Sequence, residues 1–394
     1  MLNTALFFGG YIKIKPRKII KDQHTLYLAL GTNLGNRFEY LQRAVNAIFK
    51  QIGTITNISA VYQTPALGFD GADFLNCVVA LHTQYPAKEV LSEILSIEKA
   101  LGRHRSKGPG YASRVIDIDI LFYNQDIINQ ADLQVPHPQI AHRKFVLQPL
   151  VDIAPQLLHP VFQNTLADML LQSADSSVVV KQSKLLSNPL DSYDFSKINY
   201  IAIEGNIGAG KTSLCHMLST DFNAKLILER FKDNPFLPKF YEDPQRYAFA
   251  LEMSFLADRY QQLLEDITQF DLFNECVVAD YDAYKSLIFA KVTLQQEEYN
   301  LYKKLFHLMH KELPKPDVYI YLYQNTARLL ENIKKRGRSY EEGIKAEYLQ
   351  KINDGYLEFI KNQYSDNIKI IDISGLDFVE NRSDYLRLLD QILA

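Results

Sequence analysis

The most constraining feature of the 394-residue chain is the segment Gly205–Thr212, which reads GNIGAGKT and fits G-x-x-x-x-G-K-[ST] at every position. It follows an apolar strand pattern and precedes a helical pattern, and this setting argues against a chance Gly-rich turn. Backbone N–H groups of such a turn bind phosphate oxygens together with the N-terminus of the next helix. We expect Lys211 to reach the β- and γ-phosphates of a nucleotide and Thr212 to bind Mg²⁺. The predicted nucleotide site comprises Gly205, Asn206, Ile207, Gly208, Ala209, Gly210, Lys211 and Thr212.

Chain length and pattern predict two domains, at roughly 150 residues per domain. A second strand–turn–helix pattern opens at Leu26, and a Ser- and Asp-rich stretch without periodicity separates the two patterned regions. We expect a mobile extension at residues 1–24, a first domain at 25–165, a linker at 166–197 and a second domain at 198–394. Interleaved strands and helices, with one strand over Ile55–Tyr62, predict an α+β, ferredoxin-like first domain. Strand–helix alternation, with one helix over Ser286–Glu312, predicts an α/β second domain with a parallel sheet.

Charge and cysteine content exclude several classes of protein. Lys and Arg total 43 against 46 Asp and Glu, a net charge of −3, so we expect no nucleic-acid partner. The apolar runs do not favour a membrane-spanning helix, and we expect no membrane partner. The cysteines at 77, 215 and 276 lie too far apart for a disulfide framework or a zinc site, which favours a cytoplasmic protein.

Two arginines follow a basic helical segment in the second domain, in the sequence RGRSYEE. Closely spaced guanidinium groups can clamp phosphoryl oxygens and stabilise the charge of phosphoryl transfer. A solvated basic helix end would give the same sequence. The residues alone leave both interpretations of Arg336 and Arg338 open.

The second domain resembles the deoxyribonucleoside kinase family over nearly all of residues 198–394. The resemblance rests on the phosphate-binding turn, on LILERF around Glu229, on NPFLPKFYEDPQRYAF at Asn234–Phe249, on RGR and on EYL. It implies that Glu229 is the general base toward a sugar 5′-hydroxyl, a role that needs a carboxylate within hydrogen-bond reach. Further implied roles are 3′-hydroxyl binding by Tyr241 and Glu341, a position beside the base and phosphate for Arg259, and a lid containing Arg336 and Arg338.

Two positions depart from that family's pattern. Glu252 stands where the family usually has Gln, and a carboxylate accepts hydrogen bonds, so it suits the donor edges of adenine, cytosine or guanine and repels the carbonyl face of thymine. The family's Glu-Arg pair after the third strand is also missing. Asp280 is the expected Mg²⁺-organising acid, with Asp282 as a second candidate, and Lys285 is a candidate source of the missing positive charge.

In the first domain, ASRVIDIDILFY at Ala112–Tyr123 carries two acids that alternate with apolar residues. A strand places Asp117 and Asp119 on one face, roughly 7 Å apart, where they suit Mg²⁺ ions that bridge phosphates. Paired acids on an exposed strand face are the alternative. A base-rich loop at Gly102–Arg114 and His137 lie close in sequence, which favours a triphosphate site.

Residues 25–160 resemble 6-hydroxymethyl-7,8-dihydropterin pyrophosphokinase throughout, in LALGTNLGNR, VYQTPALGF, FLNCVVAL, IEKALGR, RVIDIDILFY, VPHP and RKFVLQPL. The resemblance implies two Mg²⁺ ions at Asp117 and Asp119. It implies contacts with ATP for Glu98, Arg103, Arg114, His137 and Arg143. It also implies a pterin pocket of Thr64, Pro65, Leu67, Phe74, Asn76 and Phe145.

These observations predict a bifunctional enzyme with ATP and Mg²⁺ as cofactors, two ions in the first site and one in the second. The first domain would transfer diphosphate from ATP to a dihydropterin, and the second would phosphorylate a deoxynucleoside at its 5′-hydroxyl. The alternatives are a catalytically silent, regulatory second domain or a nucleoside monophosphate kinase in its place. The resemblance also implies a homodimer through the kinase domain.

Overall fold

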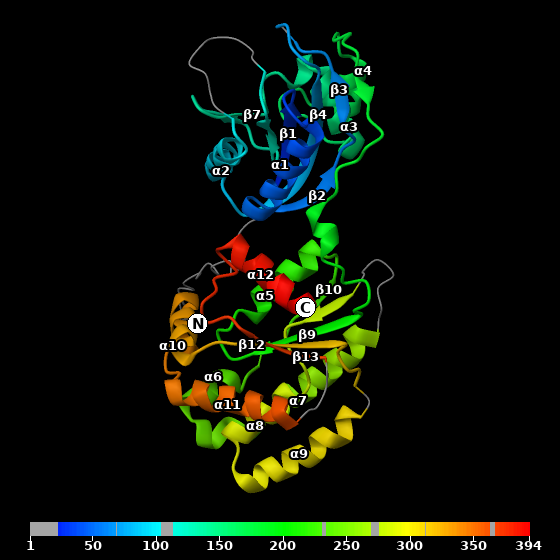
Figure 1. Cartoon of the computed structure of the whole chain (residues 1–394). Coiled ribbons are helices and arrows are strands. Elements are labelled where there is room, and N and C mark those ends of the chain that lie inside the picture. The colour runs from blue at the N-terminus through cyan, green and yellow to red at the C-terminus, as the bar shows by residue number, and fades with distance from the viewer. Residues whose placement is uncertain are drawn as a thin grey trace, which may run out of the picture.

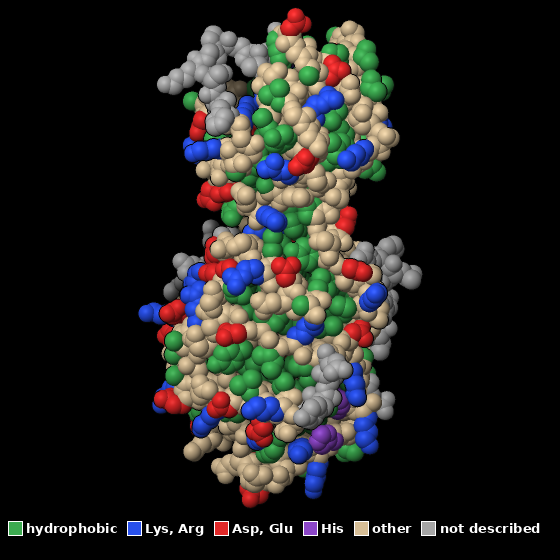
Figure 2. Space-filling model, in the orientation of Figure 1, with side chains coloured by type: hydrophobic (Ala, Val, Ile, Leu, Met, Phe, Trp, Pro, Cys, Tyr) green, Lys and Arg blue, Asp and Glu red, His purple; other side chains and the backbone are tan. Residues whose placement is uncertain are grey.

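The structure, a computed structural model, describes residues 23–67, 69–103, 113–230, 234–268, 276–311, 313–362 and 367–394. The chain forms two lobes joined at a narrow waist (Figures 1 and 2). The predicted extension at residues 1–24 therefore lies almost entirely outside the described residues, as does most of the base-rich loop before β5. Acidic and basic side chains are interspersed on the face that Figure 2 shows.

The first lobe is an antiparallel sheet with helices on both faces, as the α+β prediction requires. The strand order is β5-β1-β4-β3-β8, and β2 also pairs with β4. The series β1-α1-β2-β4-α2-β5 with the order β5-β1-β4-β2 is the ferredoxin-like arrangement. The strands are β1 (His24–Thr32), β2 (Thr54–Ile58), β3 (Tyr62–Thr64), β4 (Phe74–Thr83), β5 (Asp117–Tyr123) and β8 (Val180–Lys181), with a separate pair β6 (Ile128–Asn129) and β7 (Gln134–Val135).

Period-two burial in β1 divides the first lobe into two apolar layers. Leu26, Leu28 and Leu30 face one layer, beneath α1 and α2, while Tyr27 and Ala29 pack against the other, beneath α3 and α4. The helices are α1 (Arg37–Gln51), α2 (Ala87–Ala100), α3 (Lys144–Ile153) and α4 (Leu166–Leu171), with 3₁₀ turns η1 (Ile140–His142) and η2 (Pro189–Ser192).

The second lobe contains a five-stranded parallel sheet in the order β10-β11-β9-β12-β13, which confirms the predicted α/β class. The strands are β9 (Tyr200–Gly205), β10 (Lys225–Ile227), β11 (Val277–Ala279), β12 (Val318–Tyr323) and β13 (Ile368–Asp372). The helices are α5 (Lys211–Asp221), α6 (Leu237–Glu242), α7 (Pro244–Thr268), α8 (Lys285–Thr293), α9 (Gln296–His310), α10 (Thr326–Arg336), α11 (Ala346–Asn362) and α12 (Arg382–Leu393), with η3 (Ser339–Glu341). β9 is central, and this position carries the phosphate-binding turn to the carboxyl edge of the sheet.

Two sequence predictions of single elements were wrong. The helix expected over Ser286–Glu312 is interrupted at Leu294, whose backbone is extended, and Gln295 starts α9 with a capping box completed by Glu298. The strand expected over Ile55–Tyr62 is divided into β2 and β3, and in the gap between them Val78 N of β4 donates to the Ser59 hydroxyl at 2.9 Å.

The segment between the lobes is ordered along the first lobe. α4 packs against α3, and β8 pairs with β3. The Asn188 amide donates to Ile55 O at 3.0 Å, and the Phe195 ring lies 4.3 Å from that of Phe222 in the second lobe. The connection between the lobes is therefore packed against both, while the domain limits given above stay a prediction.

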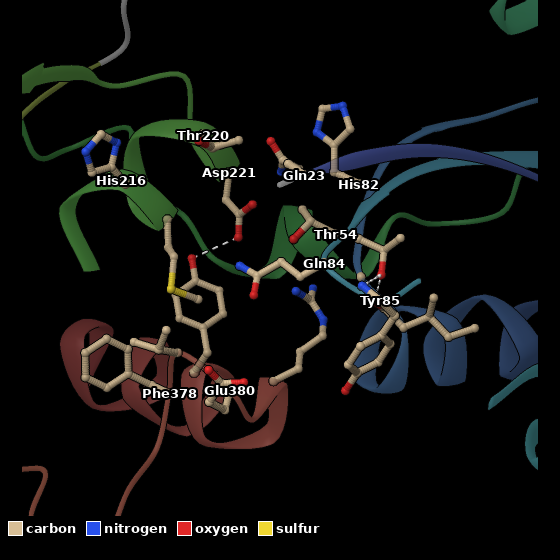
Figure 3. A pocket seen from close by; sticks show the side chains of 17 residues that line it. Gln23, Thr54, His82, Gln84, Tyr85, His216, Thr220, Asp221, Phe378 and Glu380 are labelled. Atoms are coloured by element: carbon tan, nitrogen blue, oxygen red, sulfur yellow. Dashed lines mark hydrogen bonds between the residues drawn. The ribbon is translucent and has the colours of Figure 1, made fainter. Parts of the chain in front are cut away.

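The lobes also contact each other directly. The Arg382 guanidinium of α12 donates to Phe49 O at the end of α1 and lies 4.8 Å from the Phe49 ring centroid. Beside it lies a cavity that is lined by Thr54 and His82 from the first lobe and by Asp221 from the second (Figure 3). The Tyr385 hydroxyl donates to Asp221 Oδ2 at 2.8 Å. Among the described helices, none is both long and apolar enough to cross a bilayer.

Candidate functional sites

The phosphate-binding turn leaves β9 and enters α5 through glycines with left-handed backbones. Gly208 and Gly210 have φ of 87° and 82°, and a Cβ on Gly210 would lie 2.8 Å from the Phe378 ring. Lys211 Nζ donates to Gly205 O at 2.9 Å and to Asn206 O at 3.0 Å. Burial and the nearby charge of Lys285 lower the pKa of Lys211 to about 8. The loop is thus closed around the ammonium of its own lysine.

The side chain of Asn206 forms hydrogen bonds that join this turn to the rest of the lobe. Its side-chain amide donates to Leu349 O at 2.7 Å and to Asn353 Oδ1 at 2.8 Å, and its own Oδ1 accepts from Ile207 N at 2.8 Å. Asn206 and Asn353 are fully buried. The side chain of Asn206 therefore positions the loop.

Glu229 lies at the centre of a buried cluster of charges next to the phosphate-binding turn. Its Oε1 accepts from Arg259 Nε at 2.8 Å and from Arg259 Nη2 at 2.6 Å, and its Oε2 accepts from Lys285 Nζ at 2.6 Å. Burial alone would raise the pKa of Glu229, but the charges of Lys285 and Arg259 outweigh it and hold the pKa well below its usual range. Lys285, the candidate source of the positive charge that is missing after the third strand, is thus in direct contact with Glu229.

Asp280 joins the end of β11 to the phosphate-binding turn. Its Oδ2 accepts from the Thr212 hydroxyl at 2.6 Å, and its Oδ1 accepts from Glu229 N at 2.7 Å. The oxygen set of Thr212 and Asp280 suits Mg²⁺, which takes one or two protein oxygens and otherwise water and phosphate oxygens. Asp282, the second candidate acid, accepts from Tyr284 N at 2.9 Å and shapes the turn into α8.

The lid arginines converge on one buried carboxylate. Arg336 Nε donates to Glu341 Oε2 at 3.0 Å, and Arg338 Nη1 donates to Glu341 Oε1 at 3.1 Å. The Tyr241 ring stacks on that of Tyr340 at 6.0 Å, and burial together with the charge of Glu341 raises the pKa of Tyr241. The structure thus brings the four residues expected at the lid and the 3′-hydroxyl site into one group.

Glu252 is buried in α7, about two helical turns before Arg259 on the same helix. It is 2% exposed; its Oε1 contacts the Thr293 hydroxyl at 2.9 Å, and its Oε2 has no hydrogen-bond partner among the described residues. Burial raises the pKa of Glu252 to about 7. We expected an ionised carboxylate here, whereas burial favours the neutral acid.

In the first lobe, the paired acids of β5 face a cluster of cations. Asp117 pairs with Arg103 and with Arg114, and Arg103 also pairs with Glu98. Burial and the adjacent charge of Asp117 raise the pKa of Asp119 to about 6. Glu98 is 2% exposed and accepts from Ile118 N at 2.9 Å, so it holds Arg103 against β5.

A cavity opens beside these acids at the carboxyl end of β1 and the start of β4. Asn76 donates to Thr64 Oγ1 at 2.9 Å across its floor. Burial and the charge of Arg143 lower the pKa of His137, whose Nδ1 accepts from Gln139 N at 3.2 Å. The lining includes every residue expected at the pterin pocket and most of those expected at the phosphates, namely Thr64, Pro65, Leu67, Phe74, Asn76, Phe145, Arg114, Asp117, Asp119, His137 and Arg143.

Sequence reasoning missed three residues of the kinase site. Glu204 is fully buried at the end of β9, where its Oε1 accepts from Asp282 N at 2.7 Å and its Oε2 from the Tyr356 hydroxyl at 2.8 Å. The charged residue in the apolar stretch YIAIEG was a signal for it. Ser286 accepts from Arg259 Nη1 at 2.8 Å, and Thr293 contacts Glu252; neither carries a sequence signal of its own.

Comparison with known proteins follows the division into two lobes. The family model for deoxynucleoside kinase matches residues 201–394, and that for 7,8-dihydro-6-hydroxymethylpterin-pyrophosphokinase matches residues 27–155. The deoxyguanosine kinase of Bacillus subtilis is 42% identical over 193 residues, which cover 48% of this chain and 93% of that protein. The deoxyadenosine kinase of Dictyostelium discoideum is 36% identical over 186 residues, covering 46% and 74%.

For the first lobe, the 2-amino-4-hydroxy-6-hydroxymethyldihydropteridine pyrophosphokinase of Aquifex aeolicus is 38% identical over 146 residues, covering 36% of this chain and 89% of that protein. Two phosphoryl-transferring domains are therefore present in one polypeptide. The chain belongs to both families and is a bifunctional enzyme, a pterin pyrophosphokinase followed by a deoxynucleoside kinase.

Proposed function

We propose that the kinase lobe phosphorylates purine 2′-deoxynucleosides, with deoxyguanosine as the preferred substrate. The observation that carries the proposal is the buried Oε2 of Glu252, an acceptor without a partner among the described residues. A guanine edge offers adjacent N1–H and N2–H donors to such an acceptor, and adenine offers its exocyclic amine. The names of the two kinase relatives, deoxyguanosine kinase and deoxyadenosine kinase, support the same class.

In the proposed reaction, the 5′-hydroxyl of the nucleoside donates a hydrogen bond to Glu229. A carboxylate with so low a pKa is a weak base, so it first orients the hydroxyl and takes the proton as the new O–P bond forms. The bond between the γ-phosphorus and the β-phosphate oxygen breaks, and ADP leaves. Lys211, Arg259, Arg336 and Arg338 stabilise the charge on the transferring group. Mg²⁺ held by Thr212 and Asp280 would neutralise phosphate charge.

In the first lobe, we propose that the pterin hydroxymethyl oxygen attacks the β-phosphorus of ATP. Its proton passes to solvent water, the bond between the β-phosphorus and the oxygen bridging to the α-phosphate breaks, and AMP leaves with that oxygen. Asn76 and the rings of Phe74 and Phe145 orient the pterin, while Arg103, Arg114, His137 and Arg143 bind phosphates. Burial and the charge of Asp117 disfavour the anion of Asp119, and the two acids together fit a site for two Mg²⁺. Such ions would lower the pKa of the attacking alcohol.

Two other functions of the second lobe are less well supported. A silent regulatory lobe does not require a buried Lys285–Glu229–Arg259 cluster beside an intact phosphate-binding turn. A nucleoside monophosphate kinase needs cations to bind the phosphate of its acceptor. Glu229 and Glu252 lie in the proposed acceptor site and suit a neutral nucleoside better.

A substrate panel tests the proposal. The protein is incubated with ATP, Mg²⁺ and each of the four deoxynucleosides, and ADP is measured. We expect the highest kcat/KM with deoxyguanosine, then deoxyadenosine, and the lowest with thymidine. Highest activity with thymidine would contradict the proposed donor-edge selection, and highest activity with deoxyguanosine 5′-monophosphate would favour the monophosphate kinase.

We also propose a cytoplasmic location and a homodimer formed through the kinase lobe. Cys77 and Cys215 are buried and lie in no disulfide, which suits a reducing compartment. Sedimentation equilibrium of the full chain and of a kinase-lobe fragment tests the dimer, and fully monomeric species would contradict it.

A further inference from the structure

The hydroxyl of Thr293 contacts two oxygens at once. Its Oγ1 lies 3.0 Å from Phe289 O, one helical turn earlier in α8, and 2.9 Å from Glu252 Oε1 in α7. A hydroxyl has a single hydrogen, so Thr293 can donate to one of these oxygens at a time. The oxygen that does not receive this hydrogen forms a hydrogen bond with Thr293 only if it carries a hydrogen of its own and donates it to Thr293 Oγ1.

The two possible donors in this group are not equivalent. Phe289 O is a backbone carbonyl and can never donate, whereas a carboxyl oxygen can carry a proton. Both contacts can therefore be hydrogen bonds at the same time only when Glu252 is protonated on Oε1. The Glu252 O–H then donates to the Thr293 hydroxyl, and the Thr293 hydroxyl donates to Phe289 O. In the ionised state, Thr293 turns its hydrogen to Glu252 and leaves the Phe289 carbonyl.

In both states Thr293 engages Oε1 and leaves Oε2 as the oxygen offered to a ligand. That oxygen is buried and has no partner among the described residues, and an unpaired buried acceptor is energetically unfavourable. An N–H donor placed opposite Oε2 would satisfy this oxygen.

Several elements surround the Glu252 carboxyl with charged or titratable groups. Arg259 lies on α7, Lys285 on α8, Glu229 after β10, Tyr302 on α9 and Tyr348 on α11. Arg259 and Lys285 favour the anion and Glu229 disfavours it, while burial favours the neutral acid. The balance leaves the neutral acid and the anion of Glu252 both accessible near neutral pH, so the Thr293 hydroxyl can contact either form.

We propose that Thr293 is a specificity-determining residue of the kinase site, because its hydroxyl holds Glu252 Oε1 and presents Oε2 as an acceptor toward the base. The inference rests on the proposed base-reading role of Glu252. A base that places an N–H donor opposite Oε2 is accepted. A base that places a carbonyl there, such as O4 of thymine, sets two acceptors against each other and is rejected, because Thr293 keeps any acid proton of Glu252 on Oε1.

Thr293→Val tests this assignment, since valine has the shape of threonine without the hydroxyl. The freed O–H of Glu252 can then donate to a carbonyl edge. We expect the ratio of kcat/KM for deoxyguanosine to that for thymidine to fall about tenfold, the effect of roughly one hydrogen bond. Thr293→Ser keeps the hydroxyl, and we expect it to retain the wild-type ratio.

A pH series and a double variant separate this role from a structural one. In the wild type we expect the ratio to rise from pH 6 to pH 8.5, as the anion becomes the stronger acceptor, and in Thr293→Val this rise should move to higher pH. In a Glu252→Gln background, Thr293→Val should change the ratio by less than twofold. Loss of both activity and folding in Thr293→Val leaves Thr293→Ser as the deciding variant, whose ratio must then match wild type.

The outcomes separate the two proposals. An unchanged ratio in Thr293→Val, with an altered ratio in Glu252→Gln, overturns the role of Thr293 and keeps Glu252 as base reader. An unchanged ratio in Glu252→Gln removes the base-reading role itself. A wild-type ratio that does not vary with pH contradicts the two-state hydroxyl.

Discussion

At the scale of single residues, the kinase chemistry depends on how one carboxylate is held. Glu229 accepts three hydrogen bonds from Arg259 and Lys285 and is therefore fixed as an anion in a buried position. Lys285 Nζ, with a side chain 7% exposed, has no other partner of opposite charge among the described ion pairs. Removal of Lys285 would take away one of the two cations that pair with the buried carboxylate of Glu229.

Lys285→Gln should accordingly lower kcat/KM for the deoxynucleoside about 100-fold, because the charge that positions Glu229 and neutralises phosphate is lost. Lys291→Gln is the matched control, since Lys291 lies on the same helix in an exposed pair with Glu358. ADP formation measures both. Equal activities in the two variants would remove Lys285 from the site.

Glu252 gives a prediction for stability against pH. The pKa of about 7 in the folded protein lies above the ordinary 4.5, so the folded state binds this proton more tightly than the unfolded state. The contribution of this group to the free energy of unfolding therefore falls as pH rises from about 4.5 to about 7. Glu252→Gln cannot titrate, and we expect it to gain about 3 kcal/mol relative to wild type between pH 4.5 and pH 8.

Urea unfolding at the two pH values measures that difference, with the exposed Glu342→Gln as the control. A stability difference between Glu252→Gln and wild type that stays constant across this range would show that Glu252 titrates near its ordinary pKa.

At the scale of elements, the phosphate-binding turn and β5 were predictable from sequence, because each is a local pattern. The glycines, Lys211 and Thr212 lie within eight residues, and the alternation of Asp117 and Asp119 requires a strand alone. The Lys285–Glu229 contact joins residues 56 apart and depends on parallel β10 and β11 ending together. The break between α8 and α9 was missed because apolar periodicity continues through Leu294, while backbone capping at Gln295 decides the helix boundary.

The turn before α5 provides a prediction at this scale. Gly210→Ala places a Cβ in a left-handed backbone and against Phe378, which should cost about 1–3 kcal/mol and disturb the loop. We expect ADP formation to fall at least 100-fold while pterin-dependent AMP formation persists. Gly343→Ala is the control, because a Cβ there meets no atom within 4 Å. Full kinase activity in Gly210→Ala would contradict the loop geometry.

At the scale of the whole molecule, the lobes are joined by contacts that neither lobe could form alone. Arg382 and Phe49 lie 333 residues apart in the sequence, so a local sequence pattern cannot predict the hydrogen bond between them. The same junction contains Asp221 at the end of α5, the helix that starts at the phosphate-binding turn. The junction therefore depends on the tertiary packing of both lobes, which explains why the sequence predicted a linker and not an interface.

Arg382→Met should weaken this junction without touching either site. We expect calorimetry to show two separated unfolding transitions in the variant where the wild type shows closer or merged ones, with both activities retained. Arg387→Met is the control, because Arg387 lies on the same helix with a side chain 66% exposed. Identical thermograms for wild type and Arg382→Met would show that the lobes unfold independently of this contact.

The most direct test of two phosphoryl-transfer sites in one chain separates the products. With ATP and Mg²⁺, the wild type should form AMP with the hydroxymethyl-dihydropterin and ADP with deoxyguanosine. Lys211→Met should abolish ADP formation alone, and Asp119→Asn should abolish AMP formation alone. Failure of the wild type to form either product with its substrate, or loss of both products in one variant that remains folded, would contradict two independent sites.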